Sequence, residues 1–414
     1  MTGSAEPTGK GRLSSVLHES RLSLVASDAF AFLVGAVAFV EVQAVGRLYV
    51  GELILLICGL GLPLLYGRLR TQRERRLLAW FFLLATMYLL ALVAADLYRR
   101  TPFTDYARGW ARALVFLGDF AGLITLGYRR PSRLVLLVAG TVVSQLALTV
   151  FGLWPADWKF GYAYPATVAL LVLVDSRKPV WSFMTLGILG VVHLLMDYRM
   201  FGGICLLTGI LSYVKGSHSS RGIRPRAVVM AVGAAAVFGF VYLSGAGLTG
   251  SASDRVERRQ GSNIERLAGF VVAGEAIRES PIVGHGSWPK SDESVDAWAL
   301  FQEELGSGRN AEAISRQALM SPEGALIRAH SMILQAWVEA GLVGLVFFGF
   351  SFVIAVIMLV RIITAAGPNR YLALACFFGL WALWALVMSP FAGVSRLYTV
   401  TSFSLLFVLN RPTA

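Results

Sequence analysis

The residue best suited to proton transfer is His330, which lies where a long polar segment meets the apolar stretch AHSMILQAWVEAGLVG at residues 329–344. A neutral imidazole accepts a proton near pH 7, as a general base must. At about 100° per residue, Gly341 and Gly344 share the face of His330 on the predicted helix, and Glu339 lies on the opposite face. Glycines allow a neighbouring helix to approach closely, so we expect His330 to face other helices. The alternative is an interfacial histidine that only hydrogen-bonds to the preceding loop.

Arginines on the same predicted side of the chain form a second set of candidate residues. A guanidinium group stays charged, and its planar fork matches the oxygens of a phosphate. The candidates for binding a phosphate or pyrophosphate donor are Arg199, Arg258, Arg259, Arg266 and Arg278. Four arginines on another outer connection are weaker candidates for binding acceptor phosphates, or equally anionic lipid head groups: Arg99, Arg100, Arg108 and Arg112. Ion pairing with neighbouring acidic residues is the alternative for each arginine.

The sequence predicts neither a metal site nor a cofactor. His285 lies between two glycines, and it could ligate a metal together with Asp292 and Glu293, but this spacing matches no strong metal-binding motif. The three cysteines fall inside predicted apolar spans without a CxxC pair, which favours apolar filler over a disulfide or a thiolate site: Cys58, Cys205 and Cys376.

The composition places these residues in an all-α, polytopic membrane protein. The chain has 414 residues, of which 56% are hydrophobic and 15% charged, whereas soluble domains carry about 25% charged residues. Apolar runs of roughly 18 to 25 residues predict about twelve transmembrane helices. They lie near residues 27–46, 48–66, 77–97, 110–128, 134–153, 163–175, 180–198, 200–214, 227–245, 332–360, 371–389 and 393–410.

Lysine and arginine in the short loops orient these helices. Cytoplasmic loops carry an excess of both residues, and this rule places the basic loops at 68–76, 129–133 and 215–226 in the cytoplasm, together with both termini. The net charge of +12 therefore lies mainly on the cytoplasmic side. Its position favours anchoring to the inner leaflet over binding of nucleic acid.

The orientation divides the chain into four parts. Residues 1–26 form a cytoplasmic tail, residues 27–245 form transmembrane helices 1 to 9, and residues 330–414 form helices 10 to 12 with a short cytoplasmic end. Between them, residues 246–329 form one long outer loop, and loops of this length are usually functional or disordered. Two amphipathic stretches predict helices in this loop, at 265–280 before Pro281 and at 294–308.

The spacing of these residues resembles that of the O-antigen ligase and O-antigen polymerase superfamily. An arginine is followed by P-I-V-G-x-G and then by H-S-x-x-L-x-x-x-x-E-x-G-x-x-G. The matching residues are Arg266, Pro281, Gly284, Gly286, His330, Ser331, Glu339, Gly341 and Gly344. The chain departs from the pattern at Gly269 and Phe270, where members often carry tryptophan, so Arg258 or Arg259 is the alternative to Arg266.

The resemblance implies a membrane glycosyltransferase of the GT-C type in the bacterial inner membrane, with its active site facing the periplasm. Such an enzyme transfers a glycan from undecaprenyl pyrophosphate without a metal. A ligase uses lipid A–core as acceptor in lipopolysaccharide biosynthesis, and a polymerase uses another lipid-linked repeat. His330 would be the catalytic base, and Arg266 and Arg199 would bind the pyrophosphate. The candidate acceptor arginines lean toward the ligase.

The chemistry agrees with these residue types. Arginines that neutralise a pyrophosphate make it a good leaving group, and a sugar hydroxyl needs a base to attack at neutral pH. Direct attack would invert the anomeric centre. The rival prediction is a flippase or secondary transporter, based on acidic residues in or near the predicted spans, which are costly in lipid: Asp28, Glu41, Glu52, Asp96, Asp119, Asp175 and Glu339.

Overall fold

A computed structural model shows that the described part of the chain is mostly helical. It describes residues 24–44, 46–67, 69, 71–128, 130–174, 178–196, 198–217, 253–304, 311–312, 315–316, 326–327, 329–365, 369–391 and 393–410. Most of the predicted tail at 1–26, the predicted span near 227–245, Asp175 and parts of the predicted loop at 246–329 lie outside the described residues.

Helices occur at every predicted span within the described residues. In chain order the elements are the helix Leu24–Ala36, β1 (Glu41–Ala44), β2 (Gly46–Tyr49), α2 (Val50–Gly59), α3 (Leu62–Tyr66), α4 (Gln72–Arg99), α5 (Phe103–Gly127), α6 (Pro131–Val150), the π-helix η1 (Trp158–Tyr162), α7 (Ala163–Leu173), α8 (Pro179–Leu195), α9 (Arg199–Ser217), α11 (Ser253–Glu279), α12 (Asp292–Glu304), α14 (Met332–Thr364), α15 (Leu372–Met388) and α16 (Gly393–Leu409). Their bounds differ from the predicted ones by a few residues in most cases.

Local sequence signals explain where several helices begin. Thr71 caps α4, because its Oγ1 accepts a hydrogen bond from the backbone N–H of Glu74 at 3.1 Å and the Glu74 carboxylate accepts one from the backbone N–H of Thr71 at 3.3 Å. This reciprocal capping box satisfies two N–H groups that the helix leaves free. Helices α6 and α8 begin with Pro131 and Pro179, whose missing N–H is no loss at a first helical position.

Apolar helices are consistent with a membrane protein. In the described part of the chain, α4, α5, α6 and α14 are long and apolar enough to cross a membrane. Shorter apolar helices accompany them, namely Leu24–Ala36, α2, α8, α15 and α16. The prediction of a helical membrane protein is thus confirmed in its coarse form, and the number of about twelve spans stays a prediction.

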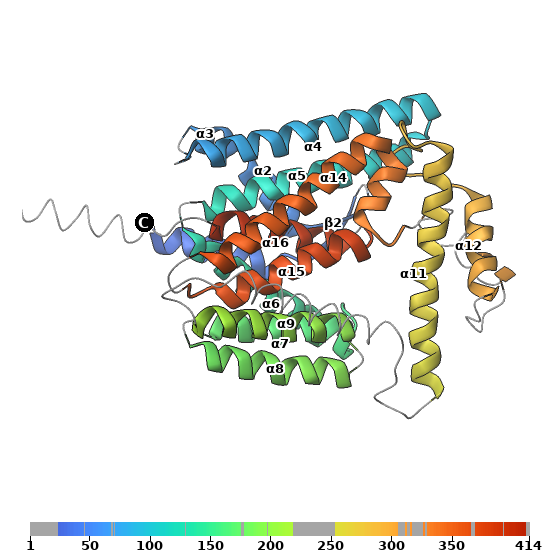
Figure 1. Cartoon of the computed structure of the whole chain (residues 1–414). Helices are drawn as coiled ribbons and strands as arrows, with labels where there is room; N and C mark the ends of the chain where they lie inside the picture. The colour runs from blue at the N-terminus through green and yellow to red at the C-terminus, as the bar shows by residue number, and fades with distance from the viewer. Residues whose placement is uncertain are drawn as a thin grey trace, which may run out of the picture.

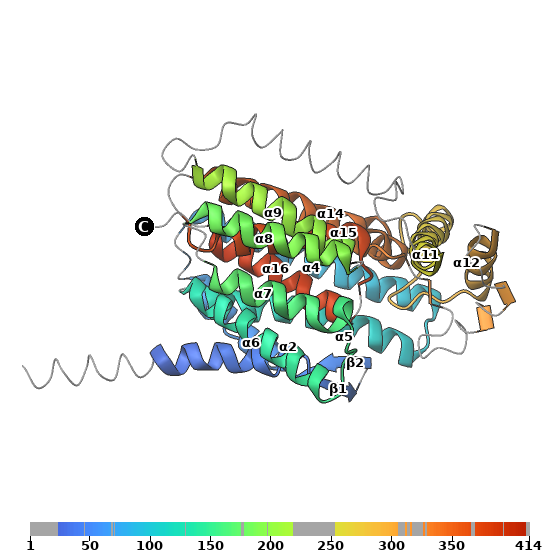
Figure 2. The same cartoon turned by 90° about the horizontal axis from the view of Figure 1, so that it is seen from below.

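The helices of the bundle run back and forth, so that successive connections alternate between its two ends (Figure 1). The helix Leu24–Ala36 begins at the end where α16 finishes, which we call the terminal end (Figure 2). The opposite end, called the loop end, carries the β1–β2 hairpin and the helices α11 and α12. Helix α11 runs across the loop end, roughly perpendicular to the bundle helices (Figures 1 and 2). The alternation agrees with the predicted sidedness of the loops.

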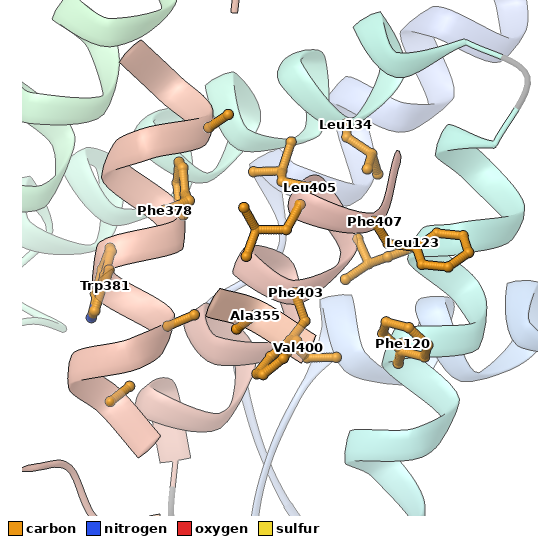
Figure 3. Packing of buried hydrophobic residues seen from close by; sticks show 14 of the residues in the cluster. Phe120, Leu123, Leu134, Ala355, Phe378, Trp381, Val400, Phe403, Leu405 and Phe407 are labelled. Atoms are coloured by element: carbon orange, nitrogen blue, oxygen red, sulfur yellow. The ribbon is translucent and has the colours of Figure 1, made fainter. Parts of the chain in front are cut away.

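A continuous apolar core joins the bundle helices, as Figure 3 shows in part. Phe120 of α5 packs against Phe407 of α16 with a ring separation of 6.4 Å. Helix α15 is apolar on all sides and contacts α9, α14 and α16, as expected for a helix in the interior. The labelled members of this core are Phe120, Leu123, Leu134, Ala355, Phe378, Trp381, Val400, Phe403, Leu405 and Phe407.

The first predicted span was wrong at its end. A helix through residue 46 was expected, but the helix ends at Ala36 and an antiparallel hairpin follows, with Glu41 opposite Tyr49 and Gln43 opposite Arg47. The polar residues Glu41, Gln43 and Arg47 are exposed, while Tyr49 is buried. These four residues lie on one face of the hairpin, of which only Tyr49 is covered. The described part of the chain is therefore not purely α-helical.

Candidate active site

His330 lies immediately before α14 rather than within it. Its φ angle is +47°, and Ser331 is the N-cap, with its Oγ accepting a hydrogen bond from the backbone N–H of Leu334 at 3.3 Å. The same hydroxyl donates to the carbonyl oxygen of Leu386 on α15 at 3.2 Å. The prediction that His330 shares a helical face with the two glycines of its motif was therefore wrong, because helical periodicity starts only at Met332.

Helix α11 brings a carboxylate to His330. Nε2 of His330 lies 3.8 Å from Oε1 of Glu265, and the two side chains are 21% and 44% exposed. This placement follows from the apolar face of α11, because Val272 and Ala276 belong to one buried cluster with Val338 of α14. Helix α11 is longer than the predicted helix at 265–280, since it begins at Ser253. Glu265 was not among the predicted site residues.

The donor arginines predicted from the sequence fall on two helices. Arg266 follows Glu265 on α11 and is half-buried, and Arg199 is the first residue of α9 at the loop end and is also half-buried. Arg278 is exposed near the end of α11. Arg258 and Arg259 lie on the first part of α11, and their side chains fall outside the described part of the structure. Arg266 is thus the residue after Glu265, whose carboxylate faces His330.

The two motif stretches meet at a kink in α14. Ala340 and Gly341 leave helical geometry, with φ of −117° and +57°. The carbonyl oxygens of Val338 and Glu339 then accept hydrogen bonds from the backbone N–H groups of His285 and Gly286, at 2.7 and 3.0 Å. The N–H of Leu342 donates to the carbonyl oxygen of Ile282 at 3.2 Å. Loop backbone thus replaces helical hydrogen bonds, so the turn at 281–286 is fastened to α14.

Glycine is required on both sides of this contact. Gly284 has φ of +84°, and Gly341 has φ of +57°, a region that other residues enter at a cost. A Cβ atom on Gly341 would meet the carbonyl oxygen of Ile282, and one on Gly284 would meet the carbonyl oxygen of Glu339. The prediction that Gly341 admits a neighbouring helix is therefore corrected, because it admits the loop backbone instead.

Arg112 is part of the scaffold, contrary to its prediction as an acceptor-binding residue. Its Nη2 lies 2.7 Å from both carboxylate oxygens of Glu339, and the side chains are 7% and 0% exposed. Arg112 also donates to the carbonyl oxygens of Ser287, at 3.0 Å, and Phe391, at 3.2 Å. A buried charge must be paired, and this pairing directs the guanidinium away from any acceptor. The Glu339 carboxylate accepts a further hydrogen bond from Gln335 at 2.6 Å.

The other three predicted acceptor arginines surround the connection between α4 and α5. Arg99 donates from Nη2 to the carbonyl oxygen of Gly284 at 3.2 Å, so it also holds the loop turn. Arg100 is exposed, with φ of +56°, at the end of α4. Arg108 is half-buried on α5. Acceptor binding by Arg99, Arg100 and Arg108 stays a prediction.

The turn is held from a third direction by Asp96 of α4. Its Oδ1 accepts a hydrogen bond from the backbone N–H of Ser287 at 2.9 Å, and its Oδ2 accepts one from Nε1 of Trp110 at 2.7 Å. His285 does not act as a free ligand, because its Nε2 lies 2.7 Å from the carbonyl oxygen of Ala276. Among the described residues, no group of three or more His, Cys, Asp or Glu side chains gathers in a metal-binding arrangement.

Comparison with known proteins assigns no family. No protein-family model matches the chain, and no curated protein matches it. The residues and geometry of the loop end are therefore the basis for the function proposed below.

Proposed function

We propose that the chain is a glycosyltransferase of the O-antigen ligase type, acting on an undecaprenyl-pyrophosphate-linked glycan at the periplasmic face of the bacterial inner membrane. The observation that carries the proposal is the direct docking of the two motif stretches, at 281–286 and 338–342, on the helix that His330 precedes. The two stretches lie far apart in sequence, and both belong to the pattern that resembles the O-antigen ligase superfamily. Their contact at the loop end is what a common site requires. The proposed acceptor is lipid A–core, and a second lipid-linked repeat is the alternative acceptor.

His330 is the proposed general base. It lies at the loop end, it is partly exposed, and Glu265 faces its Nε2 at 3.8 Å, so a protonated imidazolium would have a carboxylate nearby. Its positive φ is a strained conformation for a residue other than glycine, and such strain clusters at functional sites. In the proposed step, the imidazole of His330 takes the proton of the acceptor hydroxyl, whose oxygen attacks the anomeric carbon as the bond to the pyrophosphate oxygen breaks.

Arginines are the proposed partners of the leaving pyrophosphate. Arg266 and Arg199 are half-buried at the loop end, where a guanidinium is desolvated enough to act strongly on a phosphate. Their charge stabilises the negative charge that develops as the glycosidic bond breaks. Helix α11 lies across the loop end (Figure 1), and this cover helps to exclude water as a competing acceptor.

The test is glycan transfer in liposomes that contain a defined lipid-linked donor, with lipid A–core and a second donor molecule as competing acceptors. The key variant is His330→Asn, because asparagine tolerates positive φ but does not act as a base. We expect the transfer rate to fall about 10²- to 10⁴-fold with the unfolding midpoint unchanged. Transfer to lipid A–core would identify a ligase, and growth of the lipid-linked chain a polymerase.

One control variant and two contrary outcomes make this test decisive. His330→Gly also accepts the positive φ, so equal loss of transfer in both variants separates the missing base from any change in backbone strain. Retention of most activity in His330→Asn would remove His330 from the mechanism. Absence of transfer by the wild type to either acceptor would contradict the glycosyltransferase proposal.

A transporter of lipid-linked glycans is the second candidate function, and one observation favours it. Helices α2, α5 and α14 carry carboxylates that are buried inside the bundle, namely Glu52, Asp119 and Glu339. Acidic residues within membrane-spanning segments often mark ion or proton pathways. The same liposomes distinguish the two functions, because a flippase would move the donor between leaflets in the absence of any acceptor.

A further inference from the structure

Five carboxylate side chains are buried in the described part of the chain, and they differ in their partners. Glu52, Asp96, Asp105 and Glu339 each accept hydrogen bonds from a named donor. Asp119 of α5 is 0% exposed, and neither of its carboxylate oxygens has a hydrogen-bond partner. Removing an ionised carboxylate from water without a partner costs several kcal/mol or more. An ionised Asp119 would therefore lack the hydrogen bonds that compensate the other four carboxylates.

The surroundings of Asp119 are tightly packed and apolar. A Cβ atom on Gly118 would meet the side chain of Leu56, and one on Gly122 would meet the carbonyl oxygen of Leu55. These two glycines flank Asp119 and bring α5 directly against α2. The next residue, Phe120, packs against Phe407 of α16 (Figure 3). Asp119 thus occupies a close contact between helices and is not exposed to solvent.

The nearest cation is already neutralised. Arg396 of α16 directs Nε and Nη2 to the carboxylate of Glu52, with distances of 2.6 to 2.9 Å. Asp119 lies within electrostatic range of this pair. An ionised Asp119 would therefore leave one uncompensated negative charge next to a second carboxylate, and like charges at close range disfavour the charged form.

Tyr49 does not alter this balance. Its backbone N–H donates to Oε2 of Glu52 at 3.0 Å, and its ring belongs to the hairpin at the loop end. Burial, followed by the carboxylates of Glu41 and Glu52, raises the pKa of Tyr49 to about 12. The phenol therefore stays neutral near pH 7 and adds no negative charge. The groups that act on Asp119 from α2 and α16 are thus Glu52 and Arg396.

We propose that Asp119 is a proton-binding site within the membrane-spanning bundle, with its carboxyl group neutral in the contact between α2 and α5. Among the described residues no cluster of three potential ligands surrounds it, whereas hard cations take six or more oxygen ligands. A proton is the ligand that the site can hold. It binds as the carboxylate oxygen forms an O–H bond, and its release leaves one negative charge between α2 and α5.

This site is separate from the proposed transfer chemistry. At a rise of 1.5 Å per residue, Asp119 lies about 24 Å along α5 from Phe103 and about 12 Å from Gly127. His330, by contrast, lies next to Glu265 of α11, the helix that crosses the loop end (Figure 1). Proton binding at Asp119 therefore neither requires nor supports glycan transfer, and it stands if the proposed function fails.

The test is infrared difference spectroscopy of the purified chain in liposomes, comparing wild type with Asp119→Asn. A protonated carboxyl group has a C=O stretch distinct from that of a carboxylate, and the band shifts on deuteration. We expect this band in the wild type and its loss in Asp119→Asn. Asp105→Asn is the matched control, because Asp105 is also buried but is paired with Lys290 at 2.9 Å, so that variant should keep the band.

Thermal unfolding is a second test, which does not depend on the strength of the infrared band. Asparagine is close in shape to a neutral aspartic acid, so we expect the thermal midpoint of Asp119→Asn to differ from that of the wild type by no more than about 2 °C. A wild-type midpoint that rises with sodium, and no longer rises in Asp119→Asn, would overturn the proposal in favour of a bound cation. Absence of any band specific to Asp119 would show an ionised group and overturn it as well.

Discussion

Two acid–base pairs near the start of α14 differ in ways that separate support from chemistry. Arg112 and Glu339 are 2.7 Å apart and almost wholly buried, whereas His330 and Glu265 are 3.8 Å apart and partly exposed. The first pair joins α5 to α14, and Arg112 also donates hydrogen bonds to Ser287, next to the loop turn, and to Phe391, between α15 and α16. The second pair is longer and its side chains are partly exposed, although Nε2 of His330 itself is buried.

The buried pair helps to give the partly exposed His330 a defined position. The kink at Gly341 exposes backbone carbonyl groups that fasten the turn at 281–286, and Arg112 fastens both sides of this contact. Each backbone hydrogen bond contributes about 1 kcal/mol, so several together hold α11 and α14 in register. A rigid support of this kind is what positions a functional side chain. The loop end therefore combines a buried support with a partly exposed pair.

Breaking the buried pair should have the largest effect. Glu339→Ala leaves the guanidinium of Arg112 buried without its carboxylate, and loss of one partner of a buried pair typically costs about 3–5 kcal/mol. We expect the free energy of unfolding, measured by denaturant titration in detergent micelles, to fall by this amount. A loss below about 1 kcal/mol would show that the pair does not support the loop end.

A glycine substitution at the kink should have the next largest effect. Gly341→Ala forces a Cβ atom toward the carbonyl oxygen of Ile282 and keeps a positive φ, a strain of about 1–3 kcal/mol. Gly349 is the control on the same helix, because a Cβ atom there meets nothing within 4 Å. Gly349→Ala should leave stability unchanged or raise it by up to about 1 kcal/mol. Equal thermal midpoints for the two variants would contradict the docking of the turn on the kink.

Changing the exposed pair should have the smallest effect on stability and a clear effect on transfer. Glu265→Gln removes the charge that faces His330, and surface substitutions usually change stability by no more than about 0.5 kcal/mol. We expect kcat to fall, though less than in His330→Asn, while KM for the donor stays close to that of the wild type. A stability loss as large as that of Glu339→Ala would show that both pairs are structural.

Much of the helical framework could be predicted from the sequence. The apolar runs near 77–97, 332–360 and 371–389 correspond to α4, α14 and α15, because a long apolar run can satisfy its backbone in lipid only as a helix. The acidic residues Glu52, Asp119 and Glu339 of the predicted spans are all 0% exposed, in agreement with the cost of placing a carboxylate in lipid. An unpaired charge toward lipid is costly enough that its burial follows from residue type.

The details of the candidate site depended on contacts between distant segments. No periodicity in the sequence shows that α14 breaks at Gly341, because the break is stabilised by hydrogen bonds to His285 and Gly286. Likewise, Arg112 was assigned to an outer surface, and only the fold brings it to Glu339, which is 227 positions away.

The sequence by itself therefore determined a helical, apolar bundle with a histidine at the start of one helix, since local hydrophobicity and backbone hydrogen bonding decide those features. The tertiary structure decided that His330 precedes the helix at positive φ, that Glu265 faces it, and that Arg112 supports it. These features arise from the packing of α11 and the loop turn against α14, and packing between remote segments leaves no mark in local sequence.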